Sequence, residues 1–399
     1  GKDIPNLSPF SWEDPFLIED QLYDEEKILR DSVRNFCDDI LSKKIDAAYK
    51  EELVDRDIFL KFGEMGLLGI TVPEEYGGLG GSYVSYGLAA REIERIDSGY
   101  RSMMSVQSSL VMYPIFAYGS EEQRRKYLPE LSKGRLIGCF GLTEPDAGSD
   151  PSSMLTRAKK TSSGYVLNGS KMWITGAGYA DFFFVLAKTD PDAGYKGMSG
   201  FIVESNREGL SLGKKESNMG QRCSDTRSIS FDNVRIPANQ LVGESESGGW
   251  MNAMSAFDLS RPNIAAHATG LSRAAYEHAL QYSNERQTFG KPLHRHQAIQ
   301  FMLADMKTDI EASRMLTWKS ASEADIGVKN TESAAHAKRF ASDAAMKIST
   351  DAVQVYGGYG YSEEYPVARL MRAAKVMQIY EGSSQVQRMI IGREITKNF

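Results

Sequence analysis

The chain has 399 residues, with 47 lysines and arginines against 53 aspartates and glutamates, so its formal net charge is −6. A mildly acidic chain argues against nucleic acid or an anionic membrane as the main partner. Charged residues make up 25% and hydrophobic residues 41%, an ordinary globular composition, and the length allows two or three domains.

The N-terminal part, to about residue 134, has helical periodicity. Acidic residues at 24–26 begin one amphipathic stretch, and Ser120 followed by Gln123 forms a capping-box pattern at the start of another helix. Residues 73–81 are rich in glycine and predict a loop between these helices.

The pattern changes to that of short strands between about residues 135 and 243. Residues 165–174 form two strand-like runs around Asn168-Gly169, a pair typical of a β-hairpin turn. Short strands separated by Gly and Ser predict a β-barrel or β-sandwich domain. Further strands are expected at 182–187, 200–203 and 228–236.

Helical periodicity returns after about residue 244, with few helix breakers, which predicts a C-terminal four-helix bundle. The predicted fold class is therefore α+β and multidomain. We expect an N-terminal all-α domain (1–134), a middle β domain (135–243) and a C-terminal α-helical bundle domain (244–399).

Cysteine spacing favours neither a metal site nor a disulfide framework. Cys37, Cys139 and Cys223 form no C-x-x-C pair. The apolar run at 182–187 is far shorter than the ~20 residues of a membrane span. The acid-containing N-terminus resembles neither a secretory nor a transit peptide. We expect a soluble protein of a reducing compartment in mature form, with no transmembrane segment and no metal.

Common catalytic motifs are missing. The sequence contains no G-x-G-x-x-G, P-loop, H-E-x-x-H or G-x-S-x-G pattern. All five histidines follow residue 266, so histidine chemistry cannot come from the first two-thirds of the chain. These absences disfavour a Rossmann dehydrogenase, a P-loop NTPase and an elbow-type serine hydrolase.

Two glycine-containing segments have both a structural and a functional interpretation. Thr143 and Ser149, within residues 141–150, could meet a phosphate or an acceptor-rich ring, or the segment could simply join a helix to the sheet. The glycines after Gln354 could belong to a functional site, or they could simply form a helix C-cap.

Two charged residues are also ambiguous by themselves. Glu381 lies among apolar neighbours, where a raised pKa would suit a general base, but a helix-dipole partner is an equally ordinary role. Arg101 and Ser105 share a helix face among methionines, which indicates a buried ion pair or a carboxylate binder.

Together and in this order, these segments resemble the acyl-CoA dehydrogenase family over essentially the whole chain. The segments that carry the resemblance are 141–153, 354–369 and 381–385, supported by 73–80 and 285–290. It implies a flavoenzyme that holds FAD between the β domain and the C-terminal helices. It also implies a homotetramer, a dimer of dimers, because a neighbouring subunit completes the flavin site.

The resemblance assigns the cofactor and substrate contacts by position. The flavin-side contacts would be Phe140, Leu142, Thr143, Gly148, Ser149, Trp173 and Thr175, with Ser383 and Gln385 after the base. The contacts that a neighbouring subunit offers to the ADP half would be Arg286, Thr288, Phe289, Gln297, Gln354 and Gly358. The substrate contacts would be Ser149, Tyr380 and Gly382, with Asp258 and Arg261 near the CoA moiety.

Glu381 matches the catalytic base of the family. A thioester α-proton is weakly acidic, so preorganised donors must stabilise the enolate oxygen. The family pattern assigns that role to the Glu381 backbone N–H and a flavin ribityl hydroxyl. Glu381 would take the α-proton while FAD accepts the β-hydride.

The resemblance differs between the two halves. Up to about Trp173 the chain is most similar to glutaryl-CoA dehydrogenase, in which Arg101 matches the binder of the distal carboxylate. From about Met219 it is similar to medium- and short-chain acyl-CoA dehydrogenases. The segment after Glu381 departs from the T-Y-E-G-T-H-D pattern of the glutaryl branch, which bears on decarboxylation more than on dehydrogenation. The resemblance also implies that Glu94, Ser102 and Ser105 belong with Arg101 to the substrate-binding residues.

We therefore expect FAD-dependent oxidation of glutaryl-CoA, followed by decarboxylation to crotonyl-CoA. The alternative is a short- or medium-chain enzyme acting on monocarboxylic acyl-CoA, and a third interpretation is a non-catalytic CoA-binding helical protein. Electrons would pass to an electron-transfer flavoprotein, with O2 as the alternative acceptor. The expected compartment is the mitochondrial matrix or the bacterial cytoplasm.

Overall fold

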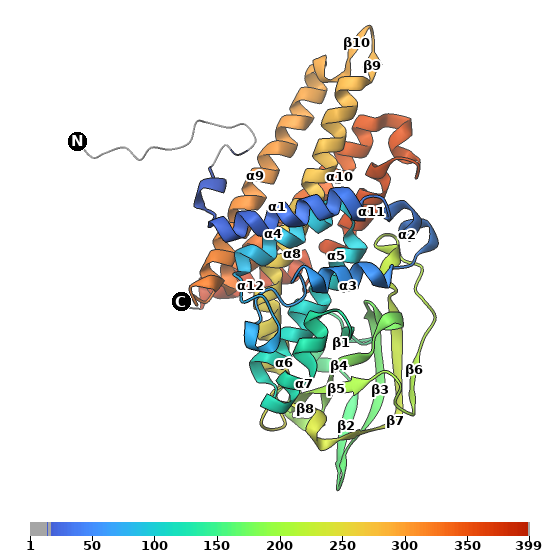
Figure 1. The fold of residues 1–399 in the computed structure, drawn as a ribbon, viewed down its shortest axis with the longest axis vertical. Helices are drawn as coiled ribbons and strands as arrows, with labels where there is room; N and C mark the ends of the chain where they lie inside the picture. Colours follow the sequence, from blue (N-terminus) through green and yellow to red (C-terminus); the bar gives the residue numbers. More distant parts are fainter. Residues whose placement is uncertain (1–13, 15–16, 398–399) are drawn as a thin grey trace, which may run out of the picture.

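The computed structural model describes residue 14 and residues 17–397. Figure 1 shows the sheet at one end of the molecule and the long C-terminal helices extending from it towards the other end. Helices α1 and α4 cross the C-terminal helices, while α6 and α7 lie beside the sheet (Figure 1). The predicted order of α, β and α segments is confirmed.

The described N-terminal part consists of helices joined by short connections. The predicted capping box is confirmed, because the Gln123 N–H donates to Ser120 Oγ at 3.1 Å and the Ser120 N–H donates to Gln123 Oε1 at 3.0 Å. The segments are η1 (Glu19–Gln21), α1 (Asp24–Phe36), the π-helix η2 (Cys37–Leu41), α2 (Ile45–Glu51), α3 (Arg56–Glu64), η3 (Glu74–Tyr76), α4 (Tyr83–Ile96), α5 (Ser98–Ser105), the π-helix η4 (Val106–Met112), α6 (Tyr113–Tyr118) and α7 (Glu121–Ser132).

Eight strands form one mixed sheet in the order β6-β7-β3-β2-β4-β5-β8, with β1 pairing with β4. Most neighbours are antiparallel, whereas β1 and β2 run parallel to β4. The predicted strands at 182–187, 200–203 and 228–236 are confirmed as β4, β5 and β7. The strands are β1 (Gly138–Gly141), β2 (Arg157–Thr161), β3 (Gly164–Ile174), β4 (Phe182–Lys188), β5 (Met198–Glu204), β6 (Leu210–Leu212), β7 (Arg227–Pro237) and β8 (Leu241–Val242).

The predicted hairpin turn at Asn168-Gly169 is wrong. Both residues lie inside the continuous strand β3, and a register shift against β7 marks an irregularity between Leu167 and Gly169. A Cβ on Gly169 would lie 2.6 Å from Thr156 Cα, so the glycine permits a close approach of two backbones. The β2–β3 hairpin instead closes between Thr161 and Gly164.

The C-terminal part is built on three long helices that pack pairwise. Helix α8 also packs against α4, so it joins the two helical regions. Many core positions of α8 and α10 are alanines, whose small side chains let the helices approach closely. The segments are α8 (Gly249–Glu285), the hairpin β9 (Gln287–Thr288) and β10 (Lys291–Pro292), α9 (Gln297–Asp325), α10 (Thr331–Tyr356), η11 (Gly357–Tyr361), α11 (Pro366–Met377) and α12 (Ser384–Thr396).

The predicted domain boundaries fall between regular elements. Residues 134 and 135 lie between α7 and β1, and residues 243 and 244 lie between β8 and α8. The division into three domains at these positions stays a prediction. Within residues 17–397, no helix is both long enough and apolar enough to cross a membrane.

Candidate active site

Arg101 lies in the interior and donates hydrogen bonds to three polar side chains. Its side chain is 1% exposed on α5, a helix whose first turn is capped by the Asp97 carboxylate accepting from the Tyr100 N–H at 2.7 Å. The Arg101 Nε donates to Glu94, one Nη donates to Ser105 Oγ at 2.9 Å, and the other donates to the Tyr380 hydroxyl at 3.0 Å. The structure therefore gathers four of the predicted substrate residues.

Glu94 makes the burial of this guanidinium possible. Its side chain is fully buried and also accepts a hydrogen bond from Ser98. Burial opposes the charged form of Arg101, but Glu94 and the Tyr380 hydroxyl outweigh it and raise the pKa of the guanidinium. Ser102 is buried in the same helix, where its backbone carbonyl accepts from the Ser105 hydroxyl at 3.1 Å.

Glu381 lies in the connection between α11 and α12, next to Tyr380. Glu381 and Gly382 both have left-handed backbone conformations, with φ of 54° and 88°. Ser383 caps α12, because its hydroxyl accepts from the Val386 N–H at 3.3 Å. A tight turn directly before a capped helix thus presents the Glu381 carboxylate, which accepts a hydrogen bond from the Ser260 hydroxyl of α8.

The surroundings of Glu381 suit a general base. Burial raises the pKa of its carboxyl, while the Ser260 hydrogen bond opposes that shift. The side chain is still partly exposed, so a ligand can reach it. Among the described residues, the Glu381 N–H donates to no backbone carbonyl, which leaves it available to a ligand oxygen.

Asp258 and Arg261 form an ion pair of 3.1 Å on α8. The Arg261 side chain is buried, and its guanidinium lies over the Phe257 ring at 5.7 Å. Its positive charge acts on Glu381. Asp258 also accepts from the Thr331 hydroxyl at 3.2 Å. Arg261 is therefore the buried member of the pair, and Asp258 is partly exposed.

A buried ion pair fixes the loop that carries the predicted flavin contacts. The Lys171 ammonium donates to Glu144 at 2.8 Å and to the Leu142 carbonyl at 3.0 Å. Glu144 also accepts from two backbone N–H groups of the chain that follows the loop. The Met172 N–H donates to the Thr143 carbonyl at 2.8 Å, which places Thr143 beside the end of β3.

The surface at this loop fits a planar, acceptor-rich group such as the flavin ring. Trp173 is 56% exposed at the end of β3, with φ of 62°. Nothing lies within 4 Å of a Cβ built on Gly148. Ser149 is exposed on the same loop, and Thr143 and Thr175 are partly exposed near its two sides. The open space, aromatic face and hydroxyls together match what a flavin requires.

Phe140 packs against the helix that contacts Glu381. Its ring packs edge-on against Phe257 of α8 with ring centroids 6.0 Å apart. Ser260, which contacts Glu381, follows Phe257 by one helical turn. Leu142 is buried at the same edge of the sheet.

The residues predicted for the ADP half lie elsewhere in the chain. Figure 1 shows the β9–β10 hairpin at the opposite end of the molecule from the sheet. Arg286, Thr288, Phe289 and Gln297 lie at or next to this hairpin, and Phe289 is 96% exposed. Gln354 and Gly358 are exposed at the end of α10, and Gln385 is exposed in the first turn of α12. One chain therefore does not bring the hairpin residues to Thr143 and Trp173.

Sequence reasoning missed three polar residues around Glu381 and Gly382. Ser260 contacts the Glu381 carboxylate, while Lys338 and Gln387 donate to the Gly382 carbonyl. All three are buried and lie on helices remote in sequence from each other. A lysine in the alanine-rich face of α10 was the one local signal, because lysine is seldom buried without a partner.

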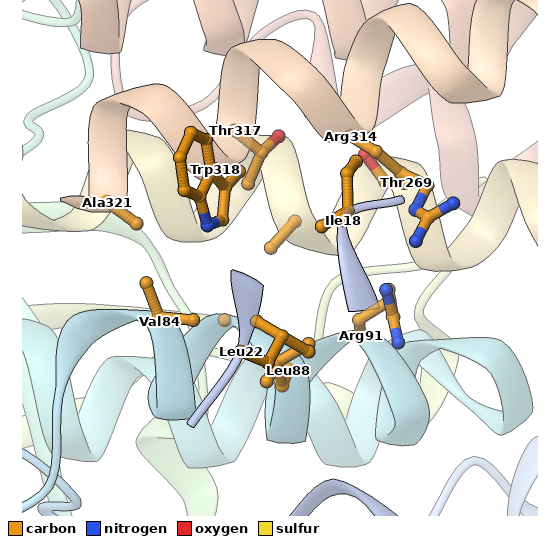
Figure 2. Close-up of a pocket in the computed structure, with 12 residues that line it drawn as sticks. Ile18, Leu22, Val84, Leu88, Arg91, Thr269, Arg314, Thr317, Trp318 and Ala321 are labelled. Atoms are coloured by element: carbon orange, nitrogen blue, oxygen red, sulfur yellow. The ribbon is translucent and has the colours of Figure 1, made fainter. Parts of the chain in front are cut away.

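A mostly apolar cavity of about 60 Å³, separate from the Glu381 site, lies between α4, α8 and α9. Figure 2 shows Arg91 and Arg314 at one end and Trp318 towards the other. None of the residues that line it contacts the Glu381 carboxylate.

Most of the chain matches three models of one protein family. Residues 23–135 match the model described as "Acyl-CoA dehydrogenase, N-terminal domain", 139–234 the middle domain and 247–396 the C-terminal domain. An acyl-CoA dehydrogenase of Bacillus subtilis is 44% identical over 92% of this chain and 97% of its own length. A short-chain specific acyl-CoA dehydrogenase of Megasphaera elsdenii is 46% identical over 86% of this chain and 89% of its own length.

Solved structures share the fold over nearly the full length. Butyryl-CoA dehydrogenase of Megasphaera elsdenii has a TM-score of 0.91 at 42% identity, covering 94% of this chain and 98% of its own. Glutaryl-CoA dehydrogenase of Mycobacterium smegmatis in complex with FADH2 has a TM-score of 0.92 at 34% identity, covering 98% and 99%. A chain in the structure of the electron transferring flavoprotein of Acidaminococcus fermentans has a TM-score of 0.92 at 41% identity, covering 94% and 99%.

The fold and the site define a flavoprotein of three parts, and the chain belongs to the acyl-CoA dehydrogenase family. It is an FAD-dependent oxidoreductase with acyl-CoA dehydrogenase activity. A non-catalytic CoA-binding protein, the third interpretation above, does not agree with these matches.

Proposed function

We propose that this acyl-CoA dehydrogenase acts on a dicarboxylyl thioester, glutaryl-CoA, with Arg101 binding the distal carboxylate and Glu381 serving as the base. The observation that carries this proposal is the hydrogen bonding of the buried guanidinium. A guanidinium has five N–H donors. Three are used by Glu94, Ser105 and Tyr380. The remaining two belong one to each terminal nitrogen, the atoms that hold a carboxylate in bidentate fashion.

The connection to the base supports the same reading. Tyr380 is hydrogen-bonded to Arg101 and directly precedes Glu381. A substrate whose far carboxylate meets Arg101 would therefore have its thioester end near the Glu381 turn. There the Glu381 N–H would donate to the thioester carbonyl, and the carboxylate would take the α-proton. Bound FAD supplies the acceptor for the β-hydride.

We further propose that decarboxylation follows dehydrogenation. Oxidation of glutaryl-CoA gives glutaconyl-CoA, and loss of CO2 leaves a dienolate. Glu381, protonated in the first step, would return its proton to that dienolate, giving crotonyl-CoA. Product analysis after anaerobic and aerobic turnover of glutaryl-CoA tests this step. Crotonyl-CoA with an equal amount of CO2 supports it, whereas accumulation of glutaconyl-CoA contradicts it.

A second candidate is a short- or medium-chain enzyme that acts on a monocarboxylic acyl-CoA. The observation that favours it is the pairing of Arg101 with buried Glu94, which already neutralises the guanidinium. The similarity to short-chain and butyryl-CoA dehydrogenases points the same way. In that case Arg101 would be structural, and an apolar acyl end would leave its two remaining N–H donors unpaired, a costly arrangement.

Anaerobic flavin reduction separates the two candidates. The purified holoenzyme would be mixed with glutaryl-CoA, butyryl-CoA or octanoyl-CoA, and the loss of oxidised-flavin absorbance followed. Fast and complete bleaching by glutaryl-CoA alone supports the dicarboxylyl substrate. Faster bleaching by butyryl-CoA or octanoyl-CoA would instead support the second candidate.

We also propose a homotetramer, a dimer of dimers, with a neighbouring subunit supplying the ADP-half contacts. The separation of Phe289 and Arg286 from Trp173 within one chain supports this assembly. Light scattering of the FAD-loaded protein would give about four times the chain mass, and a monomer with stoichiometric FAD would contradict it.

An electron-transfer flavoprotein is the proposed electron acceptor, and faster reoxidation by O2 would contradict that. The mitochondrial matrix or the bacterial cytoplasm is the proposed compartment.

A further inference from the structure

Lys338 is a buried lysine that makes no ion pair with any residue in the described part of the chain. It lies on α10, and its side chain is fully buried. Its ammonium donates a hydrogen bond of 2.8 Å to the Gly382 carbonyl, a neutral acceptor. Burial lowers the pKa of Lys338 to about 8, even though the nearby Glu381 opposes that shift. An ammonium in such a place is expensive for the fold, because an apolar side chain of similar length would avoid its desolvation.

The Gly382 carbonyl belongs to the turn that presents Glu381. Glu381 is in the left-handed region with φ of 54°, which is uncommon for a residue with a side chain. Two side chains hold the carbonyl that follows it: Lys338, and Gln387 at 2.9 Å. A strained turn persists only where its surroundings hold it in place, and these two donors do so here.

The charge of Lys338 also reaches the base. Its positive charge acts on Glu381 in the direction that favours the carboxylate. We propose that Lys338 is a positioning residue for the reaction, which holds the Glu381–Gly382 turn through the Gly382 carbonyl and places a positive charge near the Glu381 carboxylate. This inference rests on the proposed role of Glu381 as the base.

The other charged and polar groups near this pair come from every helix around it. Arg261 and Ser260 of α8 and Arg101 of α5 favour the carboxylate of Glu381. Arg261 also opposes the charge on Lys338, whereas Asp343 of α10 supports it. The charge of the same carboxylate also acts on the hydroxyls of Tyr380 and Tyr86. Because these groups stay unchanged, replacing Lys338 tests the effect of removing one positive charge and one hydrogen bond.

Three variants separate the charge from the hydrogen bond. Lys338→Met removes both, Lys338→Gln keeps a donor without charge, and Lys338→Arg keeps the charge. Lys347→Met, at an exposed lysine that pairs with Asp351 on the same helix, is the matched control. FAD content and melting temperature show which variants fold, and if Lys338→Met does not, Lys338→Gln carries the test.

The readout is the pH profile of kcat/KM together with the separate values of kcat and KM. Loss of the charge raises the pKa of Glu381, so the acid limb should move to higher pH, by about one unit for a tenfold change in ionisation. We expect kcat to fall at least about tenfold below neutral pH in Lys338→Met and Lys338→Gln. KM should change less than about threefold, because Lys338 is fully buried and its ammonium is bonded to the Gly382 carbonyl. Lys338→Arg should restore most of the profile.

A second readout does not depend on turnover. The infrared band of the protonated Glu381 carboxyl, assigned by its loss in Glu381→Gln, should titrate at higher pH in Lys338→Met than in the parent. An unchanged titration and an unchanged acid limb would overturn the inference. If Glu381→Gln itself keeps normal flavin reduction, the proposed base is wrong. If Glu381→Gln loses flavin reduction while the Lys338 variants behave like the parent, the proposed role of Glu381 stands and only the inference about Lys338 fails.

Discussion

The Arg101 guanidinium donates a hydrogen bond of 3.0 Å to the Tyr380 hydroxyl, joining residues 279 positions apart in the sequence. Arg101 belongs to a short N-terminal helix, and Tyr380 immediately precedes the proposed base. The contact therefore links the group proposed to select the substrate with the turn proposed to remove its α-proton. Arg101 comes from a helix of the N-terminal part, and Tyr380 comes from the connection between α11 and α12 near the C-terminal end.

Glu381→Gln should retain FAD and still bind acyl-CoA, but lose flavin reduction by at least about 100-fold, the usual contribution of a general base. The amide keeps the shape of the side chain and cannot accept the proton. Anaerobic stopped-flow absorbance with glutaryl-CoA measures the loss. Glu364→Gln, at an exposed glutamate, is the control. Bleaching at close to the parent rate would exclude Glu381 as the base.

Ser260→Ala should move the acid limb of kcat/KM to higher pH. The Ser260 hydroxyl donates to the Glu381 carboxylate and lowers a pKa that burial raises. Removing a hydrogen bond to a charged group costs about 1.5–3 kcal/mol, which corresponds to a shift of about one to two pH units. Activity depends on the ionised form, so the loss should be largest in acid and small in alkali. A uniform loss at every pH would argue for a steric effect.

Lys171→Met should destabilise the fold and weaken FAD binding. Lys171 and Glu144 are a buried ion pair, and removing one partner leaves the other charge buried and unpaired, which typically costs about 3–5 kcal/mol. The loop with Thr143 and Ser149 would loosen with it. Chemical denaturation and FAD titration measure the two effects. Lys159→Met, at an exposed position of β2, should change stability by less than about 0.5 kcal/mol.

The central pairings of this site were only partly predictable from sequence. Arg101 with Ser105 follows from helical spacing, and the Ser120 capping box follows from local chemistry. The predicted hairpin turn at Asn168-Gly169 is wrong because strand pairing on both sides of β3 overrides the local turn preference of these two residues. Lys338 was missed because no local pattern shows which helix face meets a turn 44 residues later.

His267 should make the protein sensitive to acid. It is fully buried in α8, and neither ring nitrogen has a hydrogen-bond partner among the described residues. Burial, reinforced by the charge of Arg101, lowers its pKa well below the ordinary 6.5. The unfolded chain then binds more protons than the folded chain below about pH 6.5, so the free energy of unfolding falls as the pH drops below that value.

His267→Leu should remove part of this acid sensitivity. The free energy of unfolding should rise by about 1 kcal/mol at neutral pH, because an unsatisfied buried polar group costs about 1–3 kcal/mol. The difference should grow between about pH 6.5 and pH 5. Denaturant titrations at several pH values give both quantities, with His336→Leu, at a partly exposed histidine, as the control. A parallel pH dependence in His267→Leu and parent would contradict the assignment.

The most direct test of the account is the ratio of kcat/KM for glutaryl-CoA to that for butyryl-CoA, measured in the parent and in Arg101→Gln. We predict a ratio above one in the parent and a fall of at least about tenfold in the variant, because a lost charge-assisted contact to a carboxylate is worth about 1.5–3 kcal/mol. The loss should fall mainly on glutaryl-CoA. Equal losses on both substrates, or a parent ratio below one, would contradict the proposed role of Arg101.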